Sequence, residues 1–329
     1  MSDKLSAVQK AKKFLFKKLA IPRVKDIYTL ENSIHDLDGS ISYSDQSEER
    51  FDIPMEFGRR ANVAVPAYSY AIKHLISCFK NIKEAVLDLK TNPKNPKTKI
   101  SEEDFEELQN FVQTLNMSGM GFTSVPRELI FKDKAILYEN AIVLMMNMDN
   151  SAINTSPSRK SSKNIWYTYD KLSVASNKIA RFLRSKGYGT HASPPLGGIA
   201  LYPMLAQKAG LGEIGYSGLL ITPTNGPTVR LAAVYTTIDN FPIIEYNNHR
   251  WIREYCEQCK RCIKSCPPGA IYAQPIEHET GRVTHIDSEK CFPYFSNNFA
   301  CSICIKVCPF NRLDYYTIKR TFQVNKNRQ

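Results

Sequence analysis

Residues 256–267, CEQCKRCIKSCP, decide how the last quarter of the chain folds. Cys256, Cys259 and Cys262 are separated by two residues each, and Cys266 follows three residues later, just before Pro267. Eight of the nine cysteines of the chain lie between residues 256 and 308. This crowding requires one chemical explanation for the whole group.

A second stretch, CSICIKVCP at residues 301–309, repeats part of the pattern. Three thiolates so close together can converge only around a compact multi-iron core, and the spacing is that of bacterial ferredoxins, where the fourth cysteine reaches the second cluster. Asn298 stands where another cysteine is expected, so Cys291 is its simplest replacement. We therefore predict two [4Fe-4S] clusters, one held by Cys256, Cys259, Cys262 and Cys308, the other by Cys266, Cys291, Cys301 and Cys304.

Two other uses of the cysteines are weaker. Zinc ribbons prefer two separated cysteine pairs over a C-x2-C-x2-C run. Disulfides belong to secreted proteins, and the basic stretch Lys12–Lys18 has lysines where an export signal has arginines, with no apolar region after it. We expect a cytoplasmic protein, with the isolated Cys78 as a small buried residue.

Composition excludes several classes of protein. The 329 residues are 43% hydrophobic and 23% charged, which is typical of folded domains with a sizeable core. No run of about 18 or more uncharged apolar residues is present, so we predict a soluble chain without a membrane span. The net charge of +12 is spread along the chain without a nucleic-acid-binding motif, so a nucleic-acid partner is possible but not favoured.

The middle of the chain mixes helical and strand patterns. Apolar spacing predicts helices starting after Pro66, after Ser101 and over residues 172–186 and 199–208. Residues 139–148 and 229–238 read as buried strands, and the polar stretch 150–164 as a loop. The cysteine region is expected to form little helix or strand.

The spacing of Gly210, Gly212 and Gly215 matches the G-x-G-x-x-G motif of dinucleotide-binding proteins. A dinucleotide-binding turn follows a strand and opens a helix, whereas this one follows a predicted helix, so we reject that interpretation. Four glycines in nine residues instead indicate a tight turn or the close approach of backbone to a bulky group.

Residues 209–223, AGLGEIGYSGLLITP, then Gly226 to Leu231 and the cysteine domain, together resemble the cobalamin-dependent reductive dehalogenases, which are related to epoxyqueuosine reductase. The resemblance covers roughly residues 165–310. It implies an α/β (α+β) fold: a nitroreductase-like core that holds base-off cobalamin and a C-terminal two-cluster ferredoxin-like domain. We divide the chain into an N-terminal arm (1–60), the core (61–245), the cluster domain (246–315) and a basic tail (316–329).

The resemblance also implies roles for residues of the core. A tyrosine before the glycine-rich stretch, Tyr167 or Tyr169, would donate a proton, with Arg230 as the cation beside it. A low-potential donor such as ferredoxin or flavodoxin would feed electrons through both clusters to Co(I) cobalamin, which reduces a small-molecule substrate. The residues expected along the corrin are Gly210, Gly212, Gly215, Leu219, Leu220, Ile221 and Thr222.

Two other functions stay open. Epoxyqueuosine reductases carry an aspartate general acid in this region, but its position here is Thr168, and Asp170 is out of phase by two residues. That departure favours the dehalogenase-like reductase over a tRNA-modifying enzyme. The third possibility is an electron-transfer or corrinoid-reducing protein without a substrate of its own.

Overall fold

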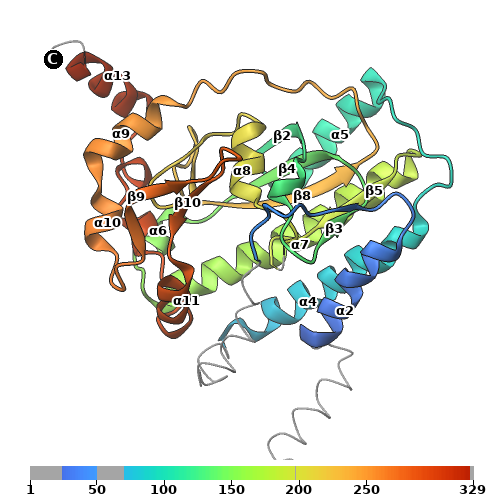
Figure 1. The fold of residues 1–329 in the computed structure, drawn as a ribbon, viewed down its shortest axis with the longest axis horizontal. Helices are drawn as coiled ribbons and strands as arrows, with labels where there is room; N and C mark the ends of the chain where they lie inside the picture. The colour runs from blue at the N-terminus through green and yellow to red at the C-terminus, as the bar shows by residue number, and fades with distance from the viewer. Residues whose placement is uncertain (1–23, 50–69, 197, 327–329) are drawn as a thin grey trace, which may run out of the picture.

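A four-stranded antiparallel sheet forms the centre of the computed structural model, which describes residues 24–49, 70–196 and 198–326 (Figure 1). The strands lie in the order β2 (Gly119–Ser124), β4 (Asn140–Asn147), β8 (Val229–Thr236) and β5 (Thr190–Ser193). β4 and β8 pair along their full length, from Asn140 opposite Thr236 to Asn147 opposite Val229. Both predicted buried strands are therefore confirmed.

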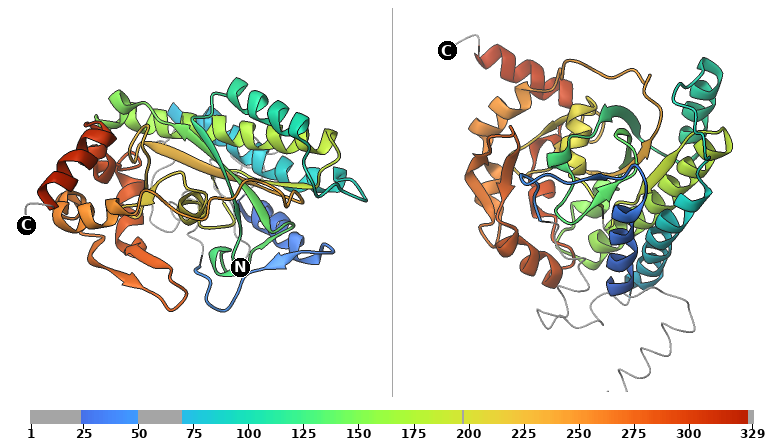
Figure 2. Two further views of the ribbon diagram at one scale, coloured as in Figure 1. Left: turned by 90° about the horizontal axis from the view of Figure 1, so that it is seen from above. Right: turned by 45° about the vertical axis from the view of Figure 1, so that its right-hand side comes forward.

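Helices cover both faces of this sheet (Figure 2). Ile142 and Leu144 of β4 pack on the face that carries α5 (Glu102–Thr114) and α7 (Arg159–Ser185). The alternate residues Val143 and Met145 pack on the face that carries α8 (Tyr202–Lys208). Because side chains alternate between the two faces of a strand, a strand covered on both sides reads as one unbroken apolar run.

The longest helix, α7, starts well before its predicted beginning. The Ser158 side chain accepts a hydrogen bond from the Ser161 backbone N–H, and the Ser161 side chain accepts one from the Ser158 backbone N–H, which forms a capping box. The short helix α6 (Asn150–Ile153) precedes it. The predicted loop at 150–164 is therefore wrong, because polar residues of this stretch cap the two helices and belong to their first turns.

Helix α5 begins after Ser101, whose side chain accepts the Asp104 N–H, so this prediction is confirmed. Helix α8 begins three residues later than predicted. α4 (Ile72–Leu87) packs against α7, and Cys78 lies fully buried between them. The start of this helix after Pro66 lies outside the described residues.

The N-terminal part that is described lies beside the core. It consists of α2 (Val24–Asn32), η1 (Ser33–Asp36) and β1 (Ile41–Ser42). β1 pairs with β3 (Ala135–Ile136). The short 3-10 helices of the core are η3 (Asp88–Thr91) and η4 (Arg127–Leu129), and β6 (Glu213–Ile214) pairs with β7 (Leu220–Ile221).

The cysteine region contains more regular structure than the sequence indicates. Its elements are α9 (Trp251–Cys259), α10 (Arg261–Ser265), β9 (Ile271–Glu277), β10 (Val283–Ile286), α11 (Ser288–Asn297), α12 (Ile303–Lys306) and η5 (Pro309–Asn311). The prediction that this region forms little helix or strand is wrong. The elements are so short that the sequence shows no clear helical or strand periodicity for them. The expected basic tail forms α13 (Tyr315–Lys326), which buries Tyr315, Ile318 and Phe322 against α9. No helix within the described part of the chain is long and apolar enough to cross a membrane.

Gly226 sits where the core meets the cluster domain. Its φ is +52°, and a Cβ placed there would lie 2.1 Å from the Phe310 carbonyl oxygen. We expect Gly226→Ala to lower the free energy of unfolding by about 2 to 4 kcal/mol, from the left-handed backbone and the clash together. Gly269→Ala is the control, with φ +62° and no atom within 4 Å of its Cβ. Denaturant unfolding should show a clearly smaller loss for the control, and equal losses would contradict the clash.

His191 of β5 gives the sheet a predictable pH response. It is buried, its Nδ1 accepts the Leu137 backbone N–H at 3.3 Å, and burial lowers its pKa to about 3. In the unfolded chain the imidazole binds a proton with a pKa near 6.5, whereas in the folded protein it stays neutral down to about pH 3. The contribution of the neutral His191 to stability is therefore fully present above pH 6.5 and is lost as the pH falls toward 3. Between about pH 7 and 4.5, the parent should lose on the order of 2 kcal/mol of its free energy of unfolding through this histidine. In His191→Gln this part of the loss should be absent, which urea unfolding at the two pH values measures. Parallel pH profiles for the two proteins would refute this.

Candidate functional site

The first group of cysteines surrounds a small pocket. Cys256, Cys259, Cys262 and Cys308 all line it, although Cys308 lies far along the chain from the others. Lys260, the residue that follows α9, has a left-handed conformation with φ 49°, which turns the chain so that Cys262 lies near Cys259. Tyr216 and Ile221 of the glycine-rich segment form another wall of this pocket.

The remaining four cysteines form a second group. Cys266 and Cys301 lie near Cys291, and Cys301 and Cys291 lie near Cys304. Cys262 is a neighbour of both Cys266 and Cys304, so the two groups adjoin. The structure thus brings together the same two sets of four that the crossed assignment predicts; their role as ligands stays a prediction.

Burial makes these thiols difficult to ionise. It raises the pKa of Cys256 to about 12 and those of Cys262 and Cys291 to about 11. Because a thiolate is the metal-binding form, each site needs a strong compensating positive charge, which iron supplies. Among the described residues, no three His, Cys, Asp or Glu side chains are arranged to hold a single metal ion. The reason to expect multi-iron clusters instead of two zinc ions is the C-x2-C-x2-C spacing of the first group.

A cavity of about 680 Å³ lies between α8, the β9–β10 hairpin and α11. Its volume is typical of sites for cofactors and drug-sized ligands. Cys291 of the second cysteine group lies on its wall, as do Ile214 and Gly218 of the glycine-rich segment. A molecule bound there would lie next to the second cysteine group.

Tyr169 of α7 also lines this cavity. Its hydroxyl accepts a hydrogen bond from Arg230 Nη1 at 3.1 Å, and the guanidinium carbon lies 4.1 Å from the centre of the ring. Arg230 reaches α7 from β8, and its buried Nε has no hydrogen-bond partner among the described residues. The predicted pair of Tyr169 and Arg230 is therefore brought together at the cavity.

Tyr167 lies elsewhere. Its side chain is 45% exposed and contacts His74 and Lys171. Two residues along a helix turn a side chain to another face, so Tyr167 and Tyr169 cannot both reach the cavity. The geometry favours Tyr169 of the two predicted donors.

Several polar residues of the cavity wall were missed by the sequence analysis. Arg282 pairs with Glu48 and donates a hydrogen bond to Thr284 Oγ1 at 3.1 Å. His285 lines the same wall, and burial lowers its pKa to about 4, so it is neutral at pH 7. These residues come from the N-terminal segment and the β9–β10 hairpin, and their sequence contains no motif that could have identified them.

Comparison with known proteins decides the relationship. The family described as a 4Fe-4S dicluster domain matches residues 255–312. A tetrachloroethene reductive dehalogenase from Desulfitobacterium hafniense is 36% identical over 197 residues, which are 56% of this chain and 34% of that protein. Over this stretch the chain is similar to the reductive dehalogenases. The match to the dicluster family confirms the prediction of two [4Fe-4S] clusters.

Other relatives agree with this result. The tetrachloroethene reductive dehalogenase of Sulfurospirillum multivorans is 30% identical over 204 residues, covering 58% of this chain and 40% of that one. The epoxyqueuosine reductase of Francisella cf. novicida (strain Fx1) is 32% identical over 136 residues, 36% of this chain and 34% of that one. The chain thus spans about a third of the length of the curated relatives it matches.

Solved structures show the same fold. A catabolic reductive dehalogenase superposes with a TM-score of 0.65 at 16% identity, over 87% of this chain and 45% of that one. A second reductive dehalogenase, described in connection with B12-dependent dehalogenation, gives 0.59 at 18% identity, over 74% and 38% of the two chains. The predicted fold, a mixed helix and sheet core with a C-terminal two-cluster domain, is confirmed.

The residues predicted along the corrin face the protein's own chain in this structure. A Cβ on Gly212 would lie 2.2 Å from the Ile221 carbonyl oxygen, and one on Gly210 would lie 2.7 Å from Ile244. Gly215 lies close to the Ile221 side chain and to Cys256 Sγ. Leu219, Leu220 and Ile221 pack in hydrophobic clusters, and the Thr222 hydroxyl donates a hydrogen bond to the Gly226 carbonyl oxygen. Their contact with a corrin stays a prediction, whereas Ile214 and Gly218 of the same segment line the cavity.

Proposed function

We propose that this chain is a corrinoid- and iron–sulfur-dependent reductase of the dehalogenase type. The observation that carries the proposal is the position of Tyr169 and Cys291 on the wall of one 680 Å³ cavity. A proton donor and the end of an electron path thereby meet where a large ligand can bind. Homology to reductive dehalogenases over more than half of the chain supports the same reaction class.

The residues of the cavity fit a corrinoid. Its wall is mainly apolar, and the polar side chains of Arg282 and His285 lie on it. Each of them has a buried atom, Arg282 Nε and His285 Nδ1, without a hydrogen-bond partner among the described residues, and a small movement of either side chain would let it bond to the amide side chains of a corrin. When bound, the corrinoid supplies a redox-active cobalt centre able to reduce a carbon–halogen bond.

The protein's own groups supply the rest of the reaction. Converting a carbon–halogen bond to a carbon–hydrogen bond takes two electrons and one proton and releases a halide ion. We assign the proton to the Tyr169 hydroxyl, which Arg230 orients by the 3.1 Å hydrogen bond. The positive guanidinium next to the ring stabilises the tyrosinate that remains after proton transfer.

The electron path is assigned to the two cysteine groups. We place one [4Fe-4S] cluster in the pocket of Cys256, Cys259, Cys262 and Cys308, and the other among Cys266, Cys291, Cys301 and Cys304. The second set holds the cavity residue Cys291, so electrons leave from there. The donor would be a low-potential protein such as ferredoxin or flavodoxin, and the location the cytoplasm.

A small organohalide is a better substrate than a tRNA nucleoside. Asp170, the acid nearest to the position used by epoxyqueuosine reductases, bonds to His74 Nδ1 at 2.7 Å between α7 and α4. Neither Asp170 nor His74 lines the cavity. The only acid groups on the cavity wall within the described residues are Glu48, Glu49 and Glu289, and Glu48 is paired with Arg282.

Anaerobic reconstitution tests this function. The chain is supplied with iron, sulfide and cobalamin, then freed of unbound cofactor, and its iron and cobalt contents are measured. About eight iron atoms and one corrinoid per chain are expected, followed by halide release from halogenated substrates with a low-potential reductant. Protein that gains iron but no corrinoid would contradict the proposal.

A further inference from the structure

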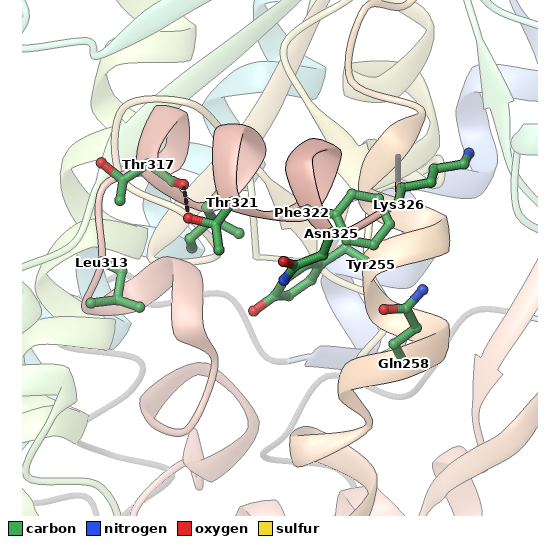
Figure 3. A pocket seen from close by; sticks show the side chains of 9 residues that line it. Tyr255, Gln258, Leu313, Thr317, Thr321, Phe322, Asn325 and Lys326 are labelled. Atoms are coloured by element: carbon green, nitrogen blue, oxygen red, sulfur yellow. Dashed lines mark hydrogen bonds between the residues drawn. The ribbon is translucent and has the colours of Figure 1, made fainter. Parts of the chain in front are cut away.

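A second hollow lies at the other end of the cluster domain. It is a groove of about 240 Å³ between α9 and α13 (Figure 3). We call it the α9–α13 groove; its lining residues include Tyr255, Gln258, Leu313, Thr317, Phe322 and Lys326. The 680 Å³ cavity shares none of the residues that line the groove.

Tyr255 connects the α9–α13 groove to the first cysteine group. Its side chain lines both the groove and the pocket of Cys256, Cys259, Cys262 and Cys308. One side chain thus separates the groove from the first cluster site.

The rim of the groove has the composition of a protein contact. Leu313, which lines the groove, is 59% exposed, and Tyr316 of α13, which does not line it, is 60% exposed. Large exposed apolar residues next to a hollow indicate a surface that another molecule covers. The groove is small, which suits the limited contact area of transient redox partners.

Cations lie near the groove, beside acidic residues such as Glu257 of α9. Lys260 and Arg261 line the adjoining cluster pocket, and Arg312 precedes Leu313. None of these three cations forms an ion pair with an acidic side chain among the residues that the structure describes. By contrast, the nearby Glu254 is neutralised by Lys326, and Arg320 acts on Asp314. Unpaired cations beside an apolar rim favour a partner with acidic groups.

We propose that the α9–α13 groove is the docking site of an acidic electron-transfer protein that delivers electrons to the first cluster. The proposal rests on the function proposed above and adds where electrons enter. Electrons would then cross from the first cluster to the second, whose ligand Cys291 faces the cavity. Entry and use of electrons take place at opposite ends of the cluster domain, so a docked donor does not block the substrate.

The test measures cluster reduction by a reduced acidic two-[4Fe-4S] ferredoxin in the reconstituted protein. The stopped-flow bleaching of the clusters gives the second-order rate constant. Arg312→Glu lies outside the cysteine loops, and we expect it to lower that constant about tenfold at low salt, with the difference shrinking as salt rises. Arg261→Glu and Leu313→Asp should act in the same direction. Lys178→Glu, an exposed cation of α7, is the matched control and should change nothing.

A small reductant separates docking from cluster damage. Methyl viologen radical does not need a protein-sized contact surface, so it should reduce all of these variants at the parent rate. If the iron content is normal but ferredoxin reduces Arg312→Glu and Leu313→Asp as fast as the parent, the docking site is wrong and the reductase survives. If the parent holds no clusters after reconstitution, both proposals are wrong.

Discussion

Replacing Tyr169 by Phe should lower the rate of substrate reduction by about 10² to 10⁴-fold. The substitution removes only the hydroxyl that accepts the Arg230 hydrogen bond, from a side chain that lines the cavity. Binding of the corrinoid and reduction of both clusters should be unaffected, because neither depends on that proton. Steady-state halide release and cobalamin titration measure the two properties separately.

Tyr167→Phe is the matched control for this prediction. It removes the same hydroxyl from the same helix, but from a side chain that is 45% exposed and contacts His74. Its rate should stay within about twofold of the parent, a difference of less than 0.5 kcal/mol. If Tyr169→Phe is as active as Tyr167→Phe, the chain takes no proton from Tyr169, and an electron-transfer protein without its own substrate becomes the better description.

Replacing Cys291 by Ala should abolish substrate reduction while leaving one cluster in place. Cys291 belongs to the second cysteine group and lies on the cavity wall. We expect the iron content to fall from about eight to about four per chain, with the electron path cut at the cavity. Cys78→Ala is the control, since this buried cysteine lies between α4 and α7 and should leave the iron content unchanged.

The crossed assignment of ligands makes a sharper version of this test possible. Cys308→Ala should destabilise the cluster of Cys256, Cys259 and Cys262, whereas Cys266→Ala should destabilise the other one. Electron paramagnetic resonance of the reduced variants shows which cluster remains. If the two substitutions have interchanged effects, each run of cysteines holds its own cluster and the crossed assignment is wrong.

The sequence predicts the cluster domain well because its chemistry is local. Three thiolates within seven residues restrict the possible ligand to a multi-iron core, without reference to the rest of the fold. Cys291 was predicted from a missing partner, and the structure places it near Cys266 and Cys301. The central strands were also predicted correctly, because a strand that is buried on both faces has an unmistakable apolar run.

The cavity could not be predicted in the same way. Its wall combines Tyr169 of α7, Gly218 of the glycine-rich segment and Arg282 of the β9–β10 hairpin, which lie far apart in the sequence. The glycines that carried the resemblance mostly allow close packing of the chain on itself, as at Gly212. A glycine requirement looks the same in sequence whether a ligand or the protein's own backbone approaches it.

The length of α7 has a consequence for how this protein could diversify. One end of this helix packs Ile179 into the hydrophobic core beside the sheet. The other end packs Ile165 into a hydrophobic cluster in the cysteine region, with Ala300, Ile305 and Cys304. Sliding or tilting it to suit a new compound would disturb the iron-binding loops and the sheet at once. New specificities should therefore arise by exchanging cavity side chains that other parts of the chain contribute, such as Phe131 and Phe292, while the tyrosine keeps its place.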